Sequence, residues 1–386
     1  GNAPHIKRLK EQGVKSAIFA PIANDDSMMG ILEIVSDKPQ VLNSINANKL
    51  VDVLPFIVSA LERSKKEEET LIDAIIQKEC TSIHPSVYWR FEKEAKQYIK
   101  DDFNGLEPVF NQIAFENVYP LFGQIDIKGS SNARNQATKK DLTIQLKLLK
   151  VILKDASDVE NLPIYEQYIY QIDKYLDGMQ NQFQVDSEQQ ISRFVKNDIE
   201  PLFHHLYEIN SLRESIDNYN NKIDDKVEAL YVHRKGYDDT IALINKEMAY
   251  LLDNKQEEAQ QMYPHFFERF KTDGVEHSLY IGESITKGKS FNKIYLYNLR
   301  LWQLQVMCEM ENDFYKLKET LPMPLDVASM ILVFGGSLSL RFRMDEKRFD
   351  VDGTYNARYE VVKKRVDKAK IKGTKERITQ SGKIAI

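Results

Sequence analysis

The sequence is poor in cysteine, glycine and proline, and each shortage narrows the range of structures. Its 386 residues include two cysteines, Cys80 and Cys308, far apart and in no spacing typical of a metal or redox site. That usage predicts a reducing, cytoplasmic location. Glycine, with 16 residues, and proline, with 12, are scarce for this length, which favours long helices.

Long apolar runs and blocks of basic charge are also missing. The longest apolar stretch, residues 327–335, has the length of a strand, well short of the roughly 20 residues of a membrane-spanning helix. The net charge is −5, and the sequence contains no strongly basic block. Neither a nucleic acid nor a membrane is therefore an expected partner. No signal peptide opens the chain, and Gly1 in place of methionine suggests that the natural start lies upstream.

No catalytic signature is recognisable. Histidines are few, no nucleophile elbow occurs, and no Ser-His-Asp or Cys-His order can be assembled. The sequence therefore identifies no cofactor and does not announce a reaction. A length of 386 residues, 42% hydrophobic and 29% charged, allows two or three globular domains.

The N-terminal region has a strand-turn-strand pattern followed by a long helix. Residues 15–37 read K-S-A-I-F-A-P-I-A-N-D-D-S-M-M-G-I-L-E-I-V-S-D, which predicts two strands around the acidic turn. Apolar residues at helical spacing then predict a helix through Ala60-Leu61-Glu62, kinked at Pro55. Over residues 6–64 this combination resembles the C-terminal half of a GAF domain.

The resemblance implies a sensor, but only part of one. A complete GAF domain has a six-stranded sheet and a ligand pocket formed largely by elements that would precede residue 1. We therefore expect two strands that are only marginally stable alone, and the family's ligand-binding residues have no counterpart here. Exit helices of GAF sensors commonly signal or dimerise; the charged residues 65–69 fit that role and equally fit a solvated linker helix.

The patterning predicts four segments. A partial GAF-like segment with its exit helix spans residues 1–68, and connecting helices with an extended stretch span 69–131. Residues 132–272 are predicted to form a large helical bundle, with Leu142, Leu146, Leu149 and Leu153 as a packing stripe. A small α/β domain follows over 273–386. The expected fold class is α+β, mainly α.

The last segment changes to a strand-like period. Strands at 275–285, 328–334, 337–344 and 382–386 alternate with helices at 291–321 and 354–370, in the order β-α-β-β-α-β. This is the split βαβ pattern of ferredoxin-like domains. Gly335-Gly336 between the middle strands predicts a hairpin.

The best candidate for a ligand site lies in residues 119–141, Y-P-L-F-G-Q-I-D-I-K-G-S-S-N-A-R-N-Q-A-T-K-K-D. A strand is expected to end at Gly129, which can adopt positive φ, and Ser130 or Ser131 to cap a helix that starts with Ala133. Free N–H groups at a helix start beside cationic side chains can hold an anion. The candidate ligand-binding residues are Lys128, Ser130, Ser131, Arg134 and Asn135.

Two features count against this site. Asp126 and Asp141 would oppose an anion, and the turn lacks the Lys-Ser/Thr ending of a P-loop. An ordinary capped strand-to-helix connection is therefore the alternative interpretation.

Two sets of residues deserve a test as metal ligands. Glu200, His204 and Glu208 are spaced to share one helix face, but a single helix supplies too few ligands, so a surface or packing role is expected. Nucleotidyl cyclases and polymerases place metal-binding carboxylates on a similar β-α-β-β-α-β core, although analogy of fold does not establish function. The acidic residues concerned would be Asp345, Glu346, Asp350 and Asp352, with Glu283 as the partner carboxylate.

Three functions remain open from sequence. The first is non-enzymatic signalling, in which a small anionic ligand or a partner shifts helix packing. The second is a Mg²⁺-dependent enzyme acting on a nucleotide or another phosphorylated small molecule, with Lys128 and Arg134 on the phosphate. The third is a scaffold that forms a homodimer through its long helices.

Overall fold

The computed structural model describes residues 4–24, 27–181, 185–352, 359, 362–363, 365–366 and 368–386. It confirms a mixed α and β chain in which helix predominates. The chain forms two compact units, Gly1–Ile113 with Phe342–Arg348, and Ala114–Arg341 with Phe349–Ile386. Within the described ranges, no helix combines the length and apolarity needed to cross a membrane.

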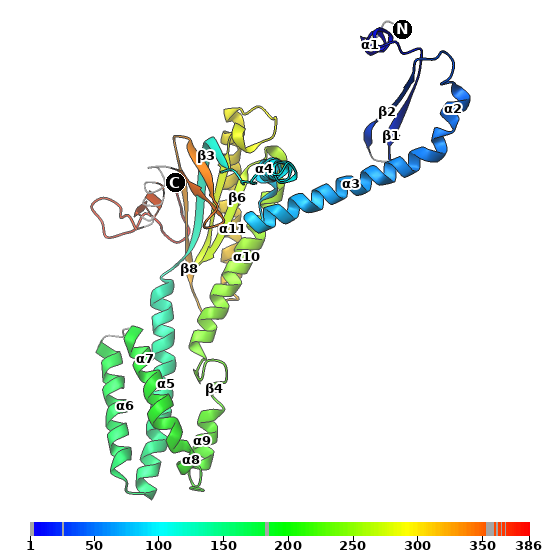
Figure 1. The fold of residues 1–386 in the computed structure, drawn as a ribbon. Helices are drawn as coiled ribbons and strands as arrows, with labels where there is room; N and C mark the ends of the chain where they lie inside the picture. The colour runs from blue at the N-terminus through cyan, green and yellow to red at the C-terminus, as the bar shows by residue number, and fades with distance from the viewer. Residues whose placement is uncertain are drawn as a thin grey trace. The chain divides into compact units, whose positions relative to one another are not determined.

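The described part of the first unit contains a β-hairpin and the helices α1–α4 (Figure 1). Its elements are α1 (Pro4–Glu11), β1 (Ser16–Ala23), β2 (Met28–Ser36), α2 (Ser44–Asn48), α3 (Leu50–Glu79) and α4 (Pro85–Phe103). The two strands pair antiparallel from Ser16 opposite Ser36 to Ala23 opposite Met28, as the sequence predicts.

The helix α3 is one continuous element of 30 residues, which crosses the predicted segment boundary at 68/69. Pro55 lies in the second turn of this helix and removes one hydrogen bond, the one to the carbonyl of Val51. The far end buries Ile72 and Ile76 against α4, and Phe91 of α4 meets Phe342 edge to face at 5.0 Å. His84 caps α4 by accepting a hydrogen bond from the Ser86 N–H at 3.3 Å.

The second unit holds one large sheet and the helices α5–α11, among the elements that the structure describes. The strands are β3 (Ala114–Lys128), β6 (Phe266–Thr272), β7 (Gly274–Ile281), β8 (Asp326–Val333), β9 (Leu338–Arg343), β10 (Arg348–Val351), β11 (Ile384–Ala385) and a small β4–β5 pair (Ile223–Asp224 and Ala229–Leu230). The helices are α5 (Ser130–Val159), α6 (Pro163–Asn181), α7 (Val185–Phe194), a π-helical turn (Val195–Ile199), α8 (Glu200–Leu206), α9 (Arg213–Asn220), α10 (His233–Met262), a 3₁₀ turn (Glu283–Ile285) and α11 (Lys293–Lys318).

The sheet is organised around β3. On one side β3 pairs antiparallel with β7, from Tyr119 opposite Ile281 to Asp126 opposite Gly274. On the other side it pairs antiparallel with β8, and β6 pairs with the outer edge of β7. The order β8-β3-β7-β6, with helices after β3 and after β7, is a split βαβ arrangement.

The predicted split βαβ domain over 273–386 is therefore wrong in its boundaries. The arrangement begins with β3, and its first crossover is occupied by the helices α5–α10. Strand β7, taken from sequence as the first strand, is the third. Pairing between β3 and β7 spans about 150 residues of chain, and no local pattern encodes so distant a partner.

The predicted hairpin at Gly335-Gly336 is also wrong. Val333 of β8 pairs with Leu121, and Leu338 of β9 pairs with Val118, so both strands run in the same direction along β3. A type I′ hairpin needs positive φ at both central residues, and neither glycine has it. The glycine pair instead separates β8 from β9, which pair with successive parts of β3. The predicted helix over 354–370 lies mostly outside the described residues.

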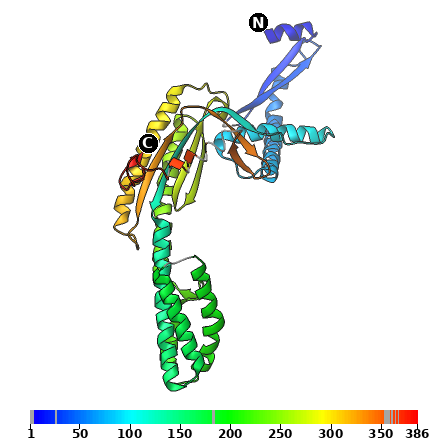
Figure 2. The same cartoon turned by 90° about the vertical axis from the view of Figure 1, so that its left-hand side faces the viewer.

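Hydrophobic cores on the sheet and in the helices α5–α9 stabilise the described part of this unit. One face of the sheet, carrying Leu121, Ile125 and Leu279, packs against α10 and α11. The helices α5–α9 form a second core, which includes Leu142, Leu146, Leu149 and Leu153 of the predicted leucine stripe. Helices α5 and α10 run from the sheet into this bundle (Figures 1 and 2).

We expect Gly123→Ala to destabilise the second unit. A Cβ at Gly123 would lie 2.4 Å from Cε1 of His277 on the neighbouring strand, and overpacking of this kind costs about 1–3 kcal/mol. Urea unfolding followed by circular dichroism measures the loss. Gly335→Ala is the control, because its Cβ would meet nothing within 4 Å. A smaller cost of Gly123→Ala in a His277→Ala background would confirm the contact, and equal costs would refute it.

Candidate functional site

The predicted turn lies where β3 passes into α5. Lys128 ends the strand, and Gly129 is the N-cap with φ 70° and ψ 19°, the left-handed region that the sequence anticipates. The helix begins at Ser130, three residues before the predicted Ala133, because Gly129 reverses the chain without needing a serine cap. No side chain hydrogen-bonds at this N-cap, so a helix start suited to anions is present.

The structure adds an acidic residue that the sequence analysis missed. Asp273, in the β6–β7 turn, accepts a hydrogen bond at 2.8 Å from the buried Ser130 hydroxyl. Its carbonyl accepts one at 2.8 Å from the Ile127 N–H, and Asp126 pairs with Gly274 beside it. The two acidic residues therefore stand on adjacent backbone at the end of β3. The Asp-Gly turn signal at 273–274 could have revealed the hairpin but not its partner.

Gly274 allows this close approach. A Cβ there would lie 2.2 Å from the carbonyl oxygen of Ile125, and its φ of 141° also disfavours other residues. The β6–β7 turn is thus pressed onto β3, which brings Asp273 to the start of α5.

The site carries charges of both signs. Lys128, Ser131, Arg134 and Asn135 are exposed, whereas Ser130 is buried and engaged by Asp273. The pKa of Tyr237 on α10 is raised, first by burial and then by the Asp273 carboxylate, while Arg134 opposes the shift. Arg134 and Asp273 therefore act electrostatically, with opposite sign, on the same Tyr237 hydroxyl. A bare anion would be opposed by Asp273, as the sequence predicts for acidic neighbours.

Asp141, the other predicted opponent of an anion, has a different role. It is fully buried and accepts hydrogen bonds at 2.9 Å from the N–H groups of His233 and Arg234, at the start of α10. Burial alone would raise the pKa of Asp141, but these hydrogen bonds outweigh burial and lower it. Asp141 is a structural cap that ties α5 to α10.

The two sets of residues weighed as metal ligands in the sequence do not form a metal site among the described residues. Helix α8 ends at Leu206, so Glu208 leaves the face of Glu200 and His204. Asp345 and Glu346 pair with Arg343, and Asp352 pairs with Arg341. No group of three or more potential metal ligands occurs among the described residues. Asp126 and Asp273 offer two carboxylates, enough for Mg²⁺ only when substrate phosphates complete its shell.

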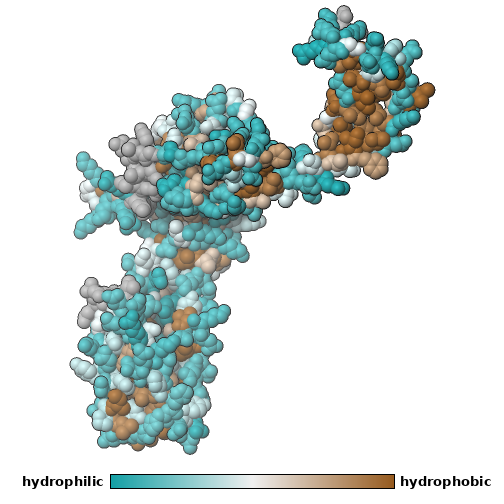
Figure 3. Space-filling model, viewed as in Figure 1, coloured by the Kyte–Doolittle hydropathy of each residue, from teal (hydrophilic) through white to brown (hydrophobic). Residues whose placement is uncertain are grey.

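The first unit exposes apolar side chains on two elements. The inner face of the β1–β2 hairpin buries Ala20 and Ile22, whereas the outer face leaves Phe19 47% and Ile31 59% exposed. On α3, Phe56 is 75% exposed. Figure 3 shows hydrophobic surface over this hairpin and the start of α3. Strands that are apolar on both faces are typical of sheets covered on both sides.

His277 is a buried histidine whose pKa is strongly shifted. It lies on β7, is 1% exposed, and has its Nε2 3.1 Å from the Gln303 side-chain nitrogen. Burial lowers the pKa of His277 to about 4, so the ring is neutral at pH 7. With no opening to solvent, it is a packing residue and not a general base.

Comparisons with known protein families, with characterised proteins and with solved structures find no match to this chain.

Stability of the second unit should fall at acid pH because of His277. Its folded pKa of about 4 lies below the usual value of about 6.5, so its stabilising effect is complete above pH 6.5 and is lost as pH falls towards 4. Between pH 7.5 and 5 the expected loss is about 2 kcal/mol. Urea midpoints at both pH values measure it.

His277→Gln should flatten this pH dependence, since glutamine does not titrate. His205→Gln is the matched control: His205 is exposed and its pKa is raised by its hydrogen bond with Glu160. Any stabilisation from that pair is lost as pH rises, the opposite direction. An unchanged pH dependence in His277→Gln would contradict the assignment.

Proposed function

We propose that this chain is an intracellular regulatory protein that binds a phosphorylated small molecule, chelated by Mg²⁺, at the β3–α5 turn. The observation behind this proposal is the position of Asp273, which is bonded to Ser130 at the open start of α5. Asp126 lies on the adjacent backbone of β3. Neither a bare anion nor a bare cation suits a site with both signs of charge. A metal-chelated phosphate carries both.

Each group in the site has a distinct role in this proposal. The two carboxylates would hold Mg²⁺, which binds proteins through one or two carboxylates together with phosphate oxygens. Lys128 and Arg134, both exposed, would contact the phosphate, with Ser131 and Asn135 at its edge. The first N–H groups of α5 would add donors without further charge.

The regulatory part of the proposal rests on the first unit. Its hairpin and exit helix are the elements through which residues 6–64 resemble half of a GAF domain. The exposed apolar surface on the hairpin and α3 supports a homodimer through these elements. Ligand binding would then shift the balance between helix arrangements.

A second candidate is a Mg²⁺-dependent enzyme acting on a nucleotide, and one observation favours it. The split βαβ core carries one acidic residue at the end of its first strand, Asp126, and one in the hairpin of its middle strands, Asp273. Nucleotidyl cyclases and polymerases use carboxylates on such a core, which is analogy of fold. Phosphorus NMR of the protein with Mg²⁺ and a nucleoside triphosphate distinguishes binding from turnover.

Asp273→Asn should abolish most of the stabilisation that Mg²⁺-ATP gives the protein. Asparagine still accepts from Ser130 but loses the charge, and a charge-assisted contact is worth about tenfold in affinity. Thermal melting with ATP, with Mg²⁺ and with both together measures the effect. Asp345→Asn, at an exposed carboxylate paired with Arg343, is the control. No stabilisation of the unmodified chain, or equal loss in both variants, would refute the site.

Phe56→Glu should convert the expected dimer into a monomer. A carboxylate would be placed within the apolar surface on α3, where it cannot be desolvated cheaply. Size-exclusion chromatography with light scattering measures the mass. Phe103→Glu is the matched control, because Phe103 is 91% exposed at the end of α4. A monomeric unmodified chain would contradict the dimer.

A further inference from the structure

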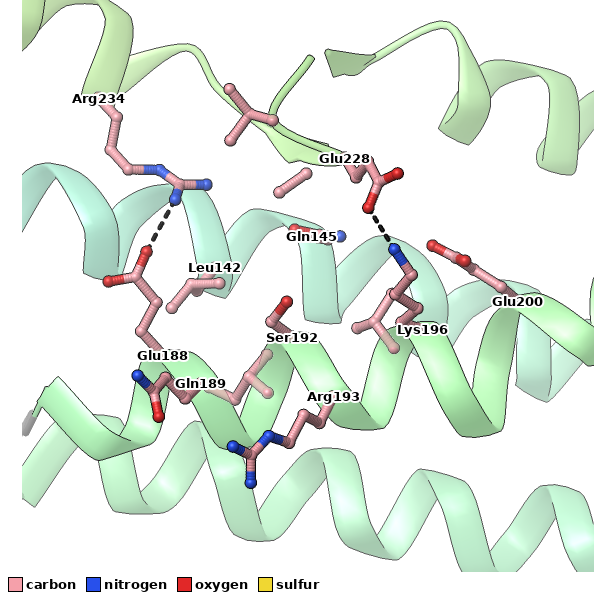
Figure 4. Close-up of a pocket in the computed structure, with 14 residues that line it drawn as sticks. Leu142, Gln145, Glu188, Gln189, Ser192, Arg193, Lys196, Glu200, Glu228 and Arg234 are labelled. Atoms are coloured by element: carbon pink, nitrogen blue, oxygen red, sulfur yellow. Dashed lines mark hydrogen bonds and ion pairs between the residues drawn. The ribbon is translucent and has the colours of Figure 1, made fainter. Parts of the chain in front are cut away.

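The helical bundle contains a cleft that the function above does not use. Its volume is about 510 Å³, within the range of small-molecule sites. One wall is α7 with the π-helical turn, the other is the β4–β5 pair with the start of α10, and α5 forms the floor (Figure 4).

The π-helical turn shapes the first wall. Pro201 has no N–H to donate to the carbonyl four residues earlier, and the Glu200 N–H bonds to Val195, five residues back. Such single-turn widenings of a helix often occur at functional sites. Here the turn contains Lys196, which reaches across the cleft to Glu228.

The floor of the cleft is apolar and its polar group is already satisfied. Leu142 of α5 lines the floor, and Ile191 and Val195 add apolar surface on the first wall. The buried Gln145 amide donates to the Tyr219 hydroxyl at 2.9 Å and accepts from the Leu230 N–H at 3.3 Å. The floor therefore offers apolar contact to a ligand, and its Gln145 amide is already hydrogen-bonded within the protein. The Ser192 hydroxyl projects into the middle of the cleft (Figure 4).

Each end of the cleft has one cation between two carboxylates. At one end Arg234 contacts Glu188 at 3.0 Å and the buried Asp141 at 3.4 Å. At the other end Lys196 pairs with Glu228, and Glu200 adds to the field that raises the pKa of Lys196. Arg193 is directed away from both ion pairs in Figure 4. The lining therefore has three carboxylates and three cations, and the buried Asp141 behind Arg234 is a fourth carboxylate.

We propose that this cleft binds a linear aliphatic polyamine. Two terminal ammonium groups would meet Glu188 at one end and Glu228 with Glu200 at the other, and the methylenes would lie on the apolar floor. Positions 188 and 196 are separated by about 12 Å along the helix, from a rise of 1.5 Å per residue, which calls for an extended molecule. The Ser192 hydroxyl would accept from an ammonium group in the middle.

Isothermal titration of the full chain with spermidine tests the proposal. We expect one site per chain, and about tenfold weaker binding in Glu188→Gln and in Glu228→Gln. Glu166→Gln is the matched control, because Glu166 is exposed on α6 and does not line the cleft. Butylamine, with one ammonium group, should bind far more weakly than spermidine. Circular dichroism checks that each variant is folded.

Several results would overturn the proposal. These are no heat of binding, several weak sites per chain, equal loss in Glu166→Gln, or preferential binding of an anion such as citrate. Because Asp273 is outside the cleft, a chain that binds spermidine but not Mg²⁺-ATP would refute only the proposed function.

Discussion

The second unit depends on the burial of β3 between two antiparallel neighbours. Of its 15 residues, those that pair with both β7 and β8 have no open edge, and their apolar side chains reach the core on α10 and α11. Every element of the candidate site takes its place from this strand. Lys128 ends it, α5 leaves from it, and the β6–β7 turn is held against it by the Ile127 N–H bond to Asp273.

A second constraint fixes where the helical segment between β3 and β6 returns to the sheet. Asp141 on α5 caps the first turn of α10, 92 residues later, so the chain returns at a defined point on α5. A carboxylate buried without partners would be too costly to keep charged. Four hydrogen bonds, from His233 and Arg234, supply those partners.

Local structure was predictable, whereas distant pairing was not. The strand before Gly129, the positive φ of that glycine, the leucine stripe of α5 and the N-terminal hairpin all follow from short-range patterns. The partners of β3 lie about 150 residues away, so the sequence misplaced the βαβ core and missed Asp273. The hairpin predicted at Gly335-Gly336 was wrong because glycine pairs also occur where a strand is interrupted. The sequence pointed to the turn at Lys128–Asn135 but not to its spatial neighbour Asp273, which adds an acidic group there.

The two proposed sites share the helices α5 and α10, so coupling between the sites can be tested. Helix α5 carries Ser130 at the turn and Leu142 on the cleft floor, and α10 carries Arg234 at the cleft and Tyr237 within the field of Asp273. Contiguity of this kind is not coupling, because coupling requires one element with two states that both ligands bias. The Asp141 cap holds α5 and α10 together in one arrangement. If both ligands change this α5–α10 arrangement, each ligand must change the affinity of the other by the same factor.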